Sequence, residues 1–305
     1  MRLAQARTPG LNRVRGAGGR SDGAMEPRNF NRLLQRGWDR QKFVCVGLDS
    51  DADSLPVAHL ASAGVGDRIF AFNRAIVDAT ADLVCAYKPN SAFYEAQGPA
   101  GIEALIRTIA HIHETAPEVP VILDAKRGDI DNTNRAYARF VFDICGADAV
   151  TVHPYLGREA LSPFLEREDR GIIVLCHNSN PGAREFQDLP TQRDRPLYQV
   201  VAEHVATVWN AHGNCAVMVG GTYPDAVETV RRIIGDMAML IAGIGAQGGD
   251  LGDAVRAGLN SRRDGVIVNS SRQVIFRSAG KDFAEAARRE VVALDSRIRR
   301  IRDGL

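Results

Sequence analysis

The sequence has few cysteines and no long apolar run, and each shortage excludes a class of protein. Its five cysteines are odd in number and form no C-x-x-C pair, so they indicate neither a disulfide framework nor a paired-cysteine metal site. No segment approaches the roughly 18 consecutive apolar residues of a membrane helix. The cysteines fall mostly in apolar runs, so we expect buried thiols, a reducing compartment and a cytoplasmic protein.

An excess of charge of one sign is also absent. The chain has 38 Lys and Arg against 37 Asp and Glu, which gives a formal net charge of +1. Such a balance provides no global attraction to nucleic acid or to a membrane surface, so neither is an expected partner. Any anionic ligand must be held by a local cluster of charges.

The sequence does contain a regular alternation of short apolar runs and helical stretches. With 305 residues and 45% hydrophobic content, the chain can bury a large core. Eight short runs rich in Val, Ile, Leu and Cys fit about 260 residues of repeated strand and helix units, which favours a single (β/α)8 TIM barrel over an open sheet. The predicted strands are Phe43 to Leu48, Leu83 to Tyr87, Val121 to Leu123, Ala149 to Val152, Ile172 to Leu175, Ala216 to Val219, Met239 to Ala242, and Val266 to Val268.

Residues 1–24 differ from the rest of the chain. They contain five arginines, one aspartate and many glycines, and they lack the apolar stretch of a secretory signal. We expect a disordered extension or a segment ahead of the natural start, with an organelle-targeting peptide as the open alternative. Met25 opens a segment typical of a helix start, so the barrel domain is predicted to span 25–305.

The most informative segment follows the third predicted strand. Asp124 and Lys126 are two residues apart, and because side chains alternate along a strand, they should share one face while Arg127 points away. Asp129 lies within loop reach. A lysine beside one carboxylate and near a second is kept charged and oriented, as a general acid requires. A structural ion pair at the barrel rim is the alternative from these residues alone.

Polar residues also follow the other predicted strands, at the barrel end where active sites of this fold lie. The glycine-rich turn 243–249 is either a tight connection or an anion site whose counter-charge is Arg272. Its G-x-G-x-x-G spelling follows the seventh strand rather than the first, so a dinucleotide fold is not indicated. The remaining polar strand ends are Asp49, Lys88, His153, His177, Asn178, Ser179 and Asn269 to Ser271.

From about Asn29 to Phe276 the sequence resembles the orotidine 5′-phosphate decarboxylases, and more narrowly their bacterial, mycobacterial-type branch. The most specific match is the D-x-K-x-x-D-I-x-x-T signature formed by Asp124, Lys126, Asp129, Ile130 and Thr133. Supporting matches are Gly47-Leu48-Asp49, Tyr87-Lys88-Pro89, Ser91-Ala92-Phe93-Tyr94-Glu95, His153-Pro154-Tyr155-Leu156-Gly157, Ser179-Asn180-Pro181-Gly182, Gly243 to Gly249, and Asn269-Ser270-Ser271-Arg272.

The resemblance implies cofactor-independent decarboxylation of orotidine 5′-monophosphate to UMP, in pyrimidine biosynthesis and without a metal. By position, Lys126 would protonate C6 of the pyrimidine, and Asp124 would adjoin the departing carboxylate. Lys88 and Asp129 would complete an alternating array of charges.

The same resemblance implies the binding residues. Asp49 would hold ribose hydroxyls, Ser179 the pyrimidine, and Gln247 with Arg272 the phosphate, while the polar loop from Ser179 to Pro190 is the candidate lid.

The resemblance further implies a homodimer with shared sites. Asp129, Ile130 and Thr133 would reach across the dimer and serve the substrate of the neighbouring subunit.

Three other functions stay open at this point. A Mg²⁺-dependent 3-keto-gulonate 6-phosphate decarboxylase shares the signature but holds its metal partly with a Glu where this chain has Lys88, and a cation there would weaken metal binding. A Schiff-base aldolase using Lys126 and a non-catalytic phosphoribosyl-binding barrel are the others. His111 and His113 lie two apart in a helical stretch, so we expect surface side chains rather than a metal pair.

Overall fold

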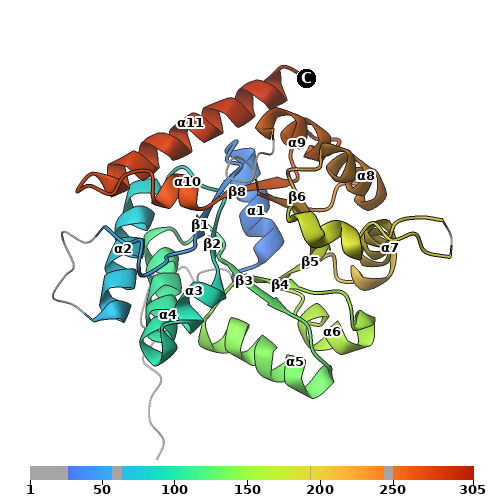
Figure 1. Ribbon diagram of the computed structural model, residues 1–305, viewed down its shortest axis with the longest axis horizontal. Coiled ribbons are helices and arrows are strands. Elements are labelled where there is room, and N and C mark those ends of the chain that lie inside the picture. The colour runs from blue at the N-terminus through green and yellow to red at the C-terminus, as the bar shows by residue number, and fades with distance from the viewer. Residues whose placement is uncertain (1–26, 57–63, 193, 244–249) are drawn as a thin grey trace, which may run out of the picture.

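The eight strands of this protein form one parallel sheet (Figure 1). The computed structural model describes residues 27–56, 64–192, 194–243 and 250–305, so the expected extension 1–24 lies outside the described residues. The strands are β1 (Val44–Leu48), β2 (Ala86–Pro89), β3 (Ile122–Arg127), β4 (Ala149–Val152), β5 (Gly171–His177), β6 (Cys215–Gly220), β7 (Met239–Ala242) and β8 (Val266–Ser270).

The strand order closes the sheet into a barrel. Neighbours follow the order β2-β1-β8-β7-β6-β5-β4-β3, and every paired strand is parallel to its neighbour. At the seam, β2 and β3 meet through two isolated parallel bridges, Tyr87 with Val121 and Asn90 with Asp124. The predicted (β/α)8 barrel is therefore confirmed.

Helices surround the barrel, and the long α11 packs outside it against α2 and α9 (Figure 1). The α-helices are α1 (Phe30–Asp39), α2 (Val65–Thr80), α3 (Ser91–Glu95), α4 (Gly98–Thr115), α5 (Asp131–Ala138), α6 (Gly157–Leu165), α7 (Leu197–His204), α8 (Pro224–Ile234), α9 (Leu251–Gly258), α10 (Arg272–Ile275) and α11 (Phe283–Asp303). Two π-helical turns, η2 (Arg139–Ile144) and η4 (Val205–Trp209), extend α5 and α7, and the 3₁₀ turn η3 is Pro181–Glu185. Within the described residues, no helix combines the length and the apolar character needed to cross a membrane.

The strands are apolar because helices cover one face and the barrel core covers the other. Every residue of β1, β4 and β8 is buried. Seven strands lie where the apolar runs predict them, but β2 begins three residues later than expected. Leu83 and Val84 belong to the turn after α2, where the Leu83 amide donates to Thr80 O at 2.9 Å.

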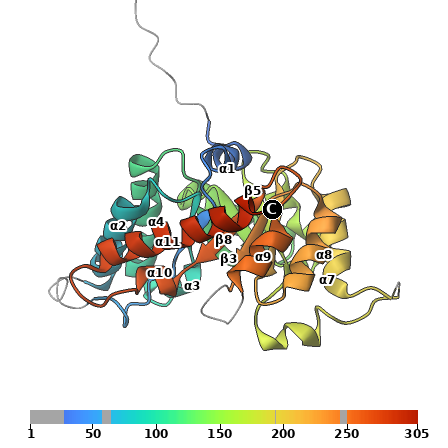
Figure 2. The same cartoon turned by 90° about the horizontal axis from the view of Figure 1, so that it is seen from above.

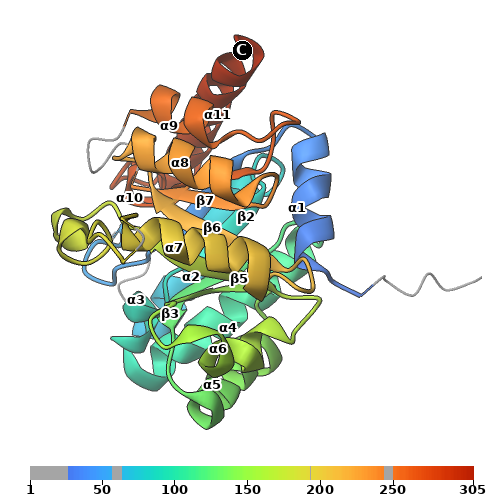
Figure 3. The ribbon, with the colours of Figure 1, turned by 90° about the vertical axis from the view of Figure 1, so that its right-hand side faces the viewer.

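Helix α1 lies across one end of the barrel, and the segment after β5 lies at the opposite end with α3 and α10 (Figures 2 and 3). The helix begins where the Asn29 side chain accepts a hydrogen bond from the Arg32 amide, as an N-cap does. Its buried face consists of Phe30, Leu34 and Trp38 with Leu33. The end that α1 covers is the one where the strands begin.

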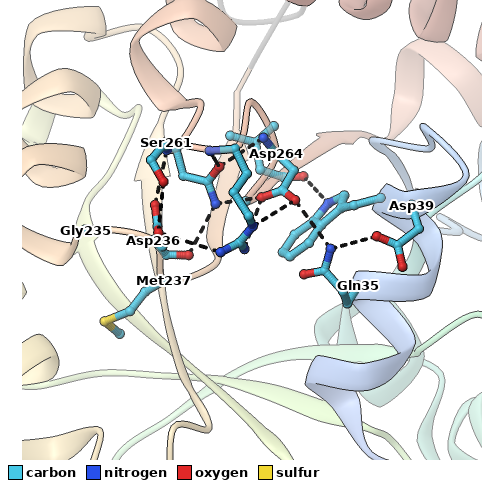
Figure 4. Close-up of polar contacts among 12 residues, drawn as sticks. Gln35, Asp39, Gly235, Asp236, Met237, Ser261 and Asp264 are labelled. Atoms are coloured by element: carbon cyan, nitrogen blue, oxygen red, sulfur yellow. Dashed lines mark hydrogen bonds and ion pairs between the residues drawn. The ribbon is translucent and has the colours of Figure 1, made fainter.

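Polar contacts tie α1 to the loops at this end (Figure 4). Gln35 donates to Asp39 at 2.9 Å and to Asp264 at 3.4 Å, while Asp236 accepts hydrogen bonds from the amide and hydroxyl of Ser261. The loop before β8 is thereby fixed to the covering helix.

A buried aspartate anchors the same end of the barrel. Asp148, just before β4, is 1% exposed and accepts two hydrogen bonds from the Arg28 guanidinium, at 2.7 and 2.8 Å, and one from the Val121 amide at 2.8 Å. Arg170 lies 3.8 Å away, and His113 contacts the carboxylate at 3.2 Å. His113 keeps 23% of its side chain exposed while it contacts this buried carboxylate.

Candidate active site

A cavity of about 300 Å³ opens at the carboxyl ends of the strands, opposite α1. Six residues predicted from the sequence for the site line it together, although they come from five separate segments of the chain. They are Asp49, Lys88, Asp124, Lys126, Ser179 and Arg272.

Four charged side chains form a row of alternating sign in this cavity. Lys88 Nζ lies 2.9 Å from Asp124 Oδ2, and Lys126 Nζ lies 2.7 Å from Asp124 Oδ1. Asp49 Oδ1 lies 3.9 Å from Lys88 Nζ. Asp124 thus sits between two ammonium groups, and Asp49 joins the row although the resemblance implied for it only a role toward ribose.

Burial and neighbouring charge oppose each other in this row. Burial raises the pKa of Asp124, but the charges of Lys88 and Lys126 and their hydrogen bonds outweigh it and hold that pKa well below its usual range. Burial lowers the pKa of Lys88, whereas Asp124 and Asp49 raise it by more, so the net shift is upward. Asp124 is therefore an anion and Lys88 a cation at any physiological pH.

Lys126 reaches Asp124 through an irregular backbone. Its φ is +46°, in the left-handed region, and the pairing of β3 with β4 shifts register between Leu123 and Arg127. Such a conformation costs about 1–2 kcal/mol for a residue with a side chain, and bulges next to active sites redirect side chains. The predicted placement of Lys126 and Asp124 on one face is confirmed, although the strand between them is not regular.

The side chain of Arg127 leaves the cavity, as alternation predicts. Its guanidinium donates to Glu95 at 2.5 Å and lies over the ring of Tyr137, 4.7 Å from the centroid. Arg127 is not among the residues that line the cavity.

Sequence reasoning missed Thr151 on β4. This side chain is fully buried; its hydroxyl donates to Asp124 Oδ1 at 2.8 Å and accepts from the Lys126 amide at 3.0 Å. The only signal in the sequence is a hydroxyl within an otherwise apolar strand, which gives no indication of its partners.

Close backbone approaches form the other walls of the cavity. A Cβ at Gly220 would lie 2.6 Å from the Ser179 amide nitrogen, and one at Gly47 would lie 1.9 Å from Ser271 Oγ. Both glycines are therefore required by space. They let β6 approach Ser179 and β1 approach the Ser271 turn.

A buried polar network supports the end of β1 next to Asp49. Ser50 donates to Asn73 at 2.5 Å, Asn73 donates to the Tyr94 hydroxyl at 2.9 Å, and Tyr94 donates to Leu48 O at 3.0 Å. Asp49 Oδ1 itself is buried without a hydrogen-bond donor among the described residues. An acceptor left in this state is suited to a donor from a ligand.

The phosphate residues that the resemblance implies are only partly within the described chain. Arg272 begins α10, is exposed and lines the cavity. Gln247 lies outside the described residues, as does most of the glycine-rich turn 243–249.

Three predicted residues do not line this cavity in the described part of the chain: Asp129, Ile130 and Thr133. They lie between β3 and the first turn of α5, where Asn134 accepts from the Asp129 amide at 3.0 Å. Ile130 is 60% exposed.

The loop after β5 is attached to a buried histidine. His177 is 2% exposed, and its Nε2 lies 2.9 Å from Asp188 Oδ1. The rings of Tyr198 and Tyr223 meet it edge-on. The candidate lid from Ser179 to Pro190 is thereby fastened to the cavity wall at Asp188.

No group of three or more His, Cys, Asp or Glu side chains in the described residues is arranged to hold a metal ion. The five cysteines are free and buried, and burial raises their pKa values.

Comparison with known proteins gives one consistent result. Residues 42–289 match the profile of the family described as "Orotidine 5'-phosphate decarboxylase / HUMPS family". The orotidine 5′-phosphate decarboxylase of Ralstonia pickettii is 47% identical over 90% of this chain and 99% of its own, and that of Aromatoleum aromaticum is 48% identical over 88% and 97%. Among solved structures, the Leishmania donovani OMP decarboxylase is 34% identical, with a TM-score of 0.75 over 88% of this chain and 99% of its own.

Proposed function

We infer the function from one premise: the chain belongs to the orotidine 5′-phosphate decarboxylase / HUMPS family. It is a carboxy-lyase that decarboxylates orotidine 5′-monophosphate to UMP in pyrimidine biosynthesis. The observation in the structure that carries this inference is the carboxylate of Asp124, held between two lysine ammonium groups at the functional end of a barrel.

We propose that Lys126 is the proton donor and that Asp124 lies beside the substrate carboxylate. The bond from C6 to the carboxylate breaks, carbon dioxide leaves, and the electron pair stays on C6, where it takes a proton from the Lys126 ammonium. Water then returns a proton to the lysine amine. Two features support this assignment: Lys126 keeps 38% of its side chain exposed, and its ammonium contacts the array.

The array also suits the charge that develops during the reaction. A carbanion at C6 is poorly delocalised by the ring, so fixed cations close to it lower the barrier. Asp124, buried and ionised, places a negative charge where a substrate carboxylate would bind, and their repulsion lessens as carbon dioxide departs. Lys88 would complete the positive field from the buried side.

We further propose that Asp49 binds ribose hydroxyls, Ser179 the pyrimidine, and Arg272 with Gln247 the phosphate. The buried, unsatisfied Oδ1 of Asp49 supports the first assignment, because a hydroxyl can donate to it. The exposed position of Arg272 on the cavity wall supports the last. Binding energy from the distant phosphate can then stabilise the closed loops around the ring.

A homodimer with shared sites is the proposed assembly. Its support is the position of Asp129, Ile130 and Thr133 outside their own cavity and the exposure of apolar side chains on the same rim. Tyr155 is 88% exposed and Leu156 is 46% exposed. Exposed apolar groups of this kind are typical of subunit contacts.

Mixed dimers test this assembly. If sites are shared, Lys126→Ala and Asp129→Ala chains are each inactive alone, and an equilibrated mixture regains about one quarter of wild-type activity, since half of the mixed dimers' sites are intact. A monomer by light scattering, or a mixture with no recovered activity, contradicts the proposal.

We place the enzyme in the cytoplasm, with a small-molecule substrate and without a cofactor, nucleic acid or membrane as partner. The five buried thiols and the net charge of +1 support this view. Fractionation of the source cells, followed by detection of the protein, is the measurement that checks it.

The first experiment follows the ultraviolet absorbance of orotidine 5′-monophosphate with purified protein in EDTA, for the wild type and for Lys126→Ala. We expect rapid conversion to UMP by the wild type and loss of at least about a thousandfold in the variant, because it removes the proton donor and one positive charge. A wild type that leaves the nucleotide unchanged overturns the function. Full activity in Lys126→Ala overturns the role of the lysine.

A further inference from the structure

One buried hydroxyl connects the two central residues of the charged row. Thr151 Oγ1 donates to Asp124 Oδ1 at 2.8 Å and accepts from the Lys126 backbone amide at 3.0 Å. A hydroxyl has a single hydrogen to donate, and the backbone amide can only donate, so the directions of both bonds are fixed. Thr151 is 0% exposed and is not among the residues that line the cavity.

The bond to the Lys126 amide occurs where the ladder between β3 and β4 is broken. Regular pairing runs as far as Leu123 with Val150 and resumes at Arg127 with Val152. Between these pairs Lys126 takes its left-handed conformation, with φ at +46°. The threonine hydroxyl therefore gives this amide a partner at the irregular position of the strand.

The bond to Asp124 fixes the orientation of the carboxylate. Asp124 Oδ1 accepts a hydrogen bond from the Thr151 hydroxyl at 2.8 Å and one from Lys126 Nζ at 2.7 Å. Asp124 Oδ2 accepts one from Lys88 Nζ at 2.9 Å. Three donors from three strands thus fix the orientation of the carboxylate plane. Rotation of the carboxylate would break all three bonds, so each ammonium keeps its own oxygen.

We propose that Thr151 is a positioning residue for proton transfer: its hydroxyl holds the Lys126 backbone in the left-handed conformation and fixes the Asp124 carboxylate, so that the Lys126 ammonium keeps one position in the cavity. The proposal rests on the proposed role of Lys126 as proton donor. Thr151 does not touch the substrate and acts through its two neighbours.

The test compares Thr151→Val, which keeps the shape and removes the hydroxyl, with Thr151→Ser, which keeps the hydroxyl. For each variant the kcat and KM for orotidine 5′-monophosphate are measured, together with exchange of the C6 hydrogen of UMP in D₂O by proton NMR. By reversibility, the group that donates the proton to C6 also removes it, so this exchange reports on Lys126 without loss of carbon dioxide. Thr80→Val is the matched control, because Thr80 is also fully buried and its hydroxyl bonds Ile76 O and Tyr87 away from the cavity.

We expect Thr151→Val to lower both kcat and the exchange rate by about ten- to a hundredfold, with KM within about twofold of the wild type. Thr151→Ser should stay within about threefold in every parameter, and Thr80→Val should match the wild type. If Thr151→Val does not fold, Thr151→Ala removes the same hydroxyl without bulk and is expected to give the same loss.

Three results overturn the inference while the proposed function stands: wild-type kcat in the folded valine or alanine variant, an equal loss in the serine variant, or a loss confined to KM. A wild type without turnover overturns the proposed function, and this inference with it. Lys126→Ala, measured in the same assay, separates the two cases.

Discussion

Each end of this barrel holds a buried aspartate surrounded by cations, but the two clusters differ in their donors. At the end covered by α1, Asp148 accepts two hydrogen bonds from the Arg28 guanidinium and one from the Val121 backbone amide. At the open end, Asp124 accepts hydrogen bonds from the ammonium groups of Lys88 and Lys126 and from the Thr151 hydroxyl. Both carboxylates are less than 5% exposed.

The difference indicates which cluster stabilises the fold and which is available for chemistry. A guanidinium fork has a fixed shape and permanent charge, whereas an ammonium is a point charge on a flexible stem that can transfer a proton. The Arg28 guanidinium also donates to the carbonyls of Pro117 and Val119, so its donors are satisfied by the protein. Lys126, by contrast, stays partly exposed at a cavity and has a strained backbone.

The largest expected contrast is in catalysis. Asp124→Asn removes the charge that holds both lysines, so kcat should fall by about a thousandfold or more, whereas Asp148→Asn should keep kcat per folded molecule within about twofold. Steady-state decarboxylation by the two purified variants, corrected for the folded fraction, measures this contrast. Equal losses of kcat in both variants would show that the two ends of the barrel do not have separate roles.

The second expected contrast is in stability. Asp148→Asn leaves the Arg28 guanidinium and the Val121 amide with a weaker acceptor, so the free energy of unfolding should fall by about 2–3 kcal/mol. Urea unfolding followed by circular dichroism measures it. Lys126→Ala, which leaves Asp124 paired with Lys88, serves as the comparison and should change stability by less than about 1 kcal/mol. A larger loss of unfolding free energy in Lys126→Ala than in Asp148→Asn would contradict the assignment of the Asp148 cluster to stability.

The smallest expected effect is on acid stability. Burial raises the pKa of Asp148, but the hydrogen bonds and charges of Arg28 and His113 together outweigh it and hold that pKa at about 2. Since that pKa is depressed by folding, the stabilisation is complete above the unfolded value of about 4 and is lost as pH falls through 2; it amounts to about 2 kcal/mol.

Unfolding free energies measured between pH 5 and pH 2 test this effect. The wild type should lose more stability over that interval than Asp148→Asn, because only the wild type must protonate this carboxylate. Parallel curves for the two proteins would exclude Asp148 as a source of acid sensitivity.

The fold was readable from the sequence because each strand of a parallel barrel is a compact apolar run. Polar residues directly after those runs, such as Asp49 and Lys88, could be assigned to one end because all parallel strands finish there. Strand β2 begins three residues after the start of its apolar run, because Leu83 is apolar yet packs in the turn after α2.

The contacts that organise the two clusters could not be read in the same way. Arg28 and Asp148 are 120 residues apart. Thr151 lies in β4, where the other three residues are apolar. Their pairing depends on strand register and on the bulge at Lys126, which are properties of the assembled barrel. Sequence spacing identifies residues of one segment that share a face, but not which distant segment supplies the partner.

The seam between β2 and β3 has a consequence for how the barrel is held shut. Within the described strands, these neighbours share two isolated bridges in place of a continuous ladder, and the Lys88 to Asp124 ion pair crosses from one to the other. The barrel is therefore closed at this joint by a few backbone contacts together with one buried ion pair between side chains. Both members of this ion pair also line the cavity, so the residues that join the two ends of the sheet are among those proposed to act on the substrate.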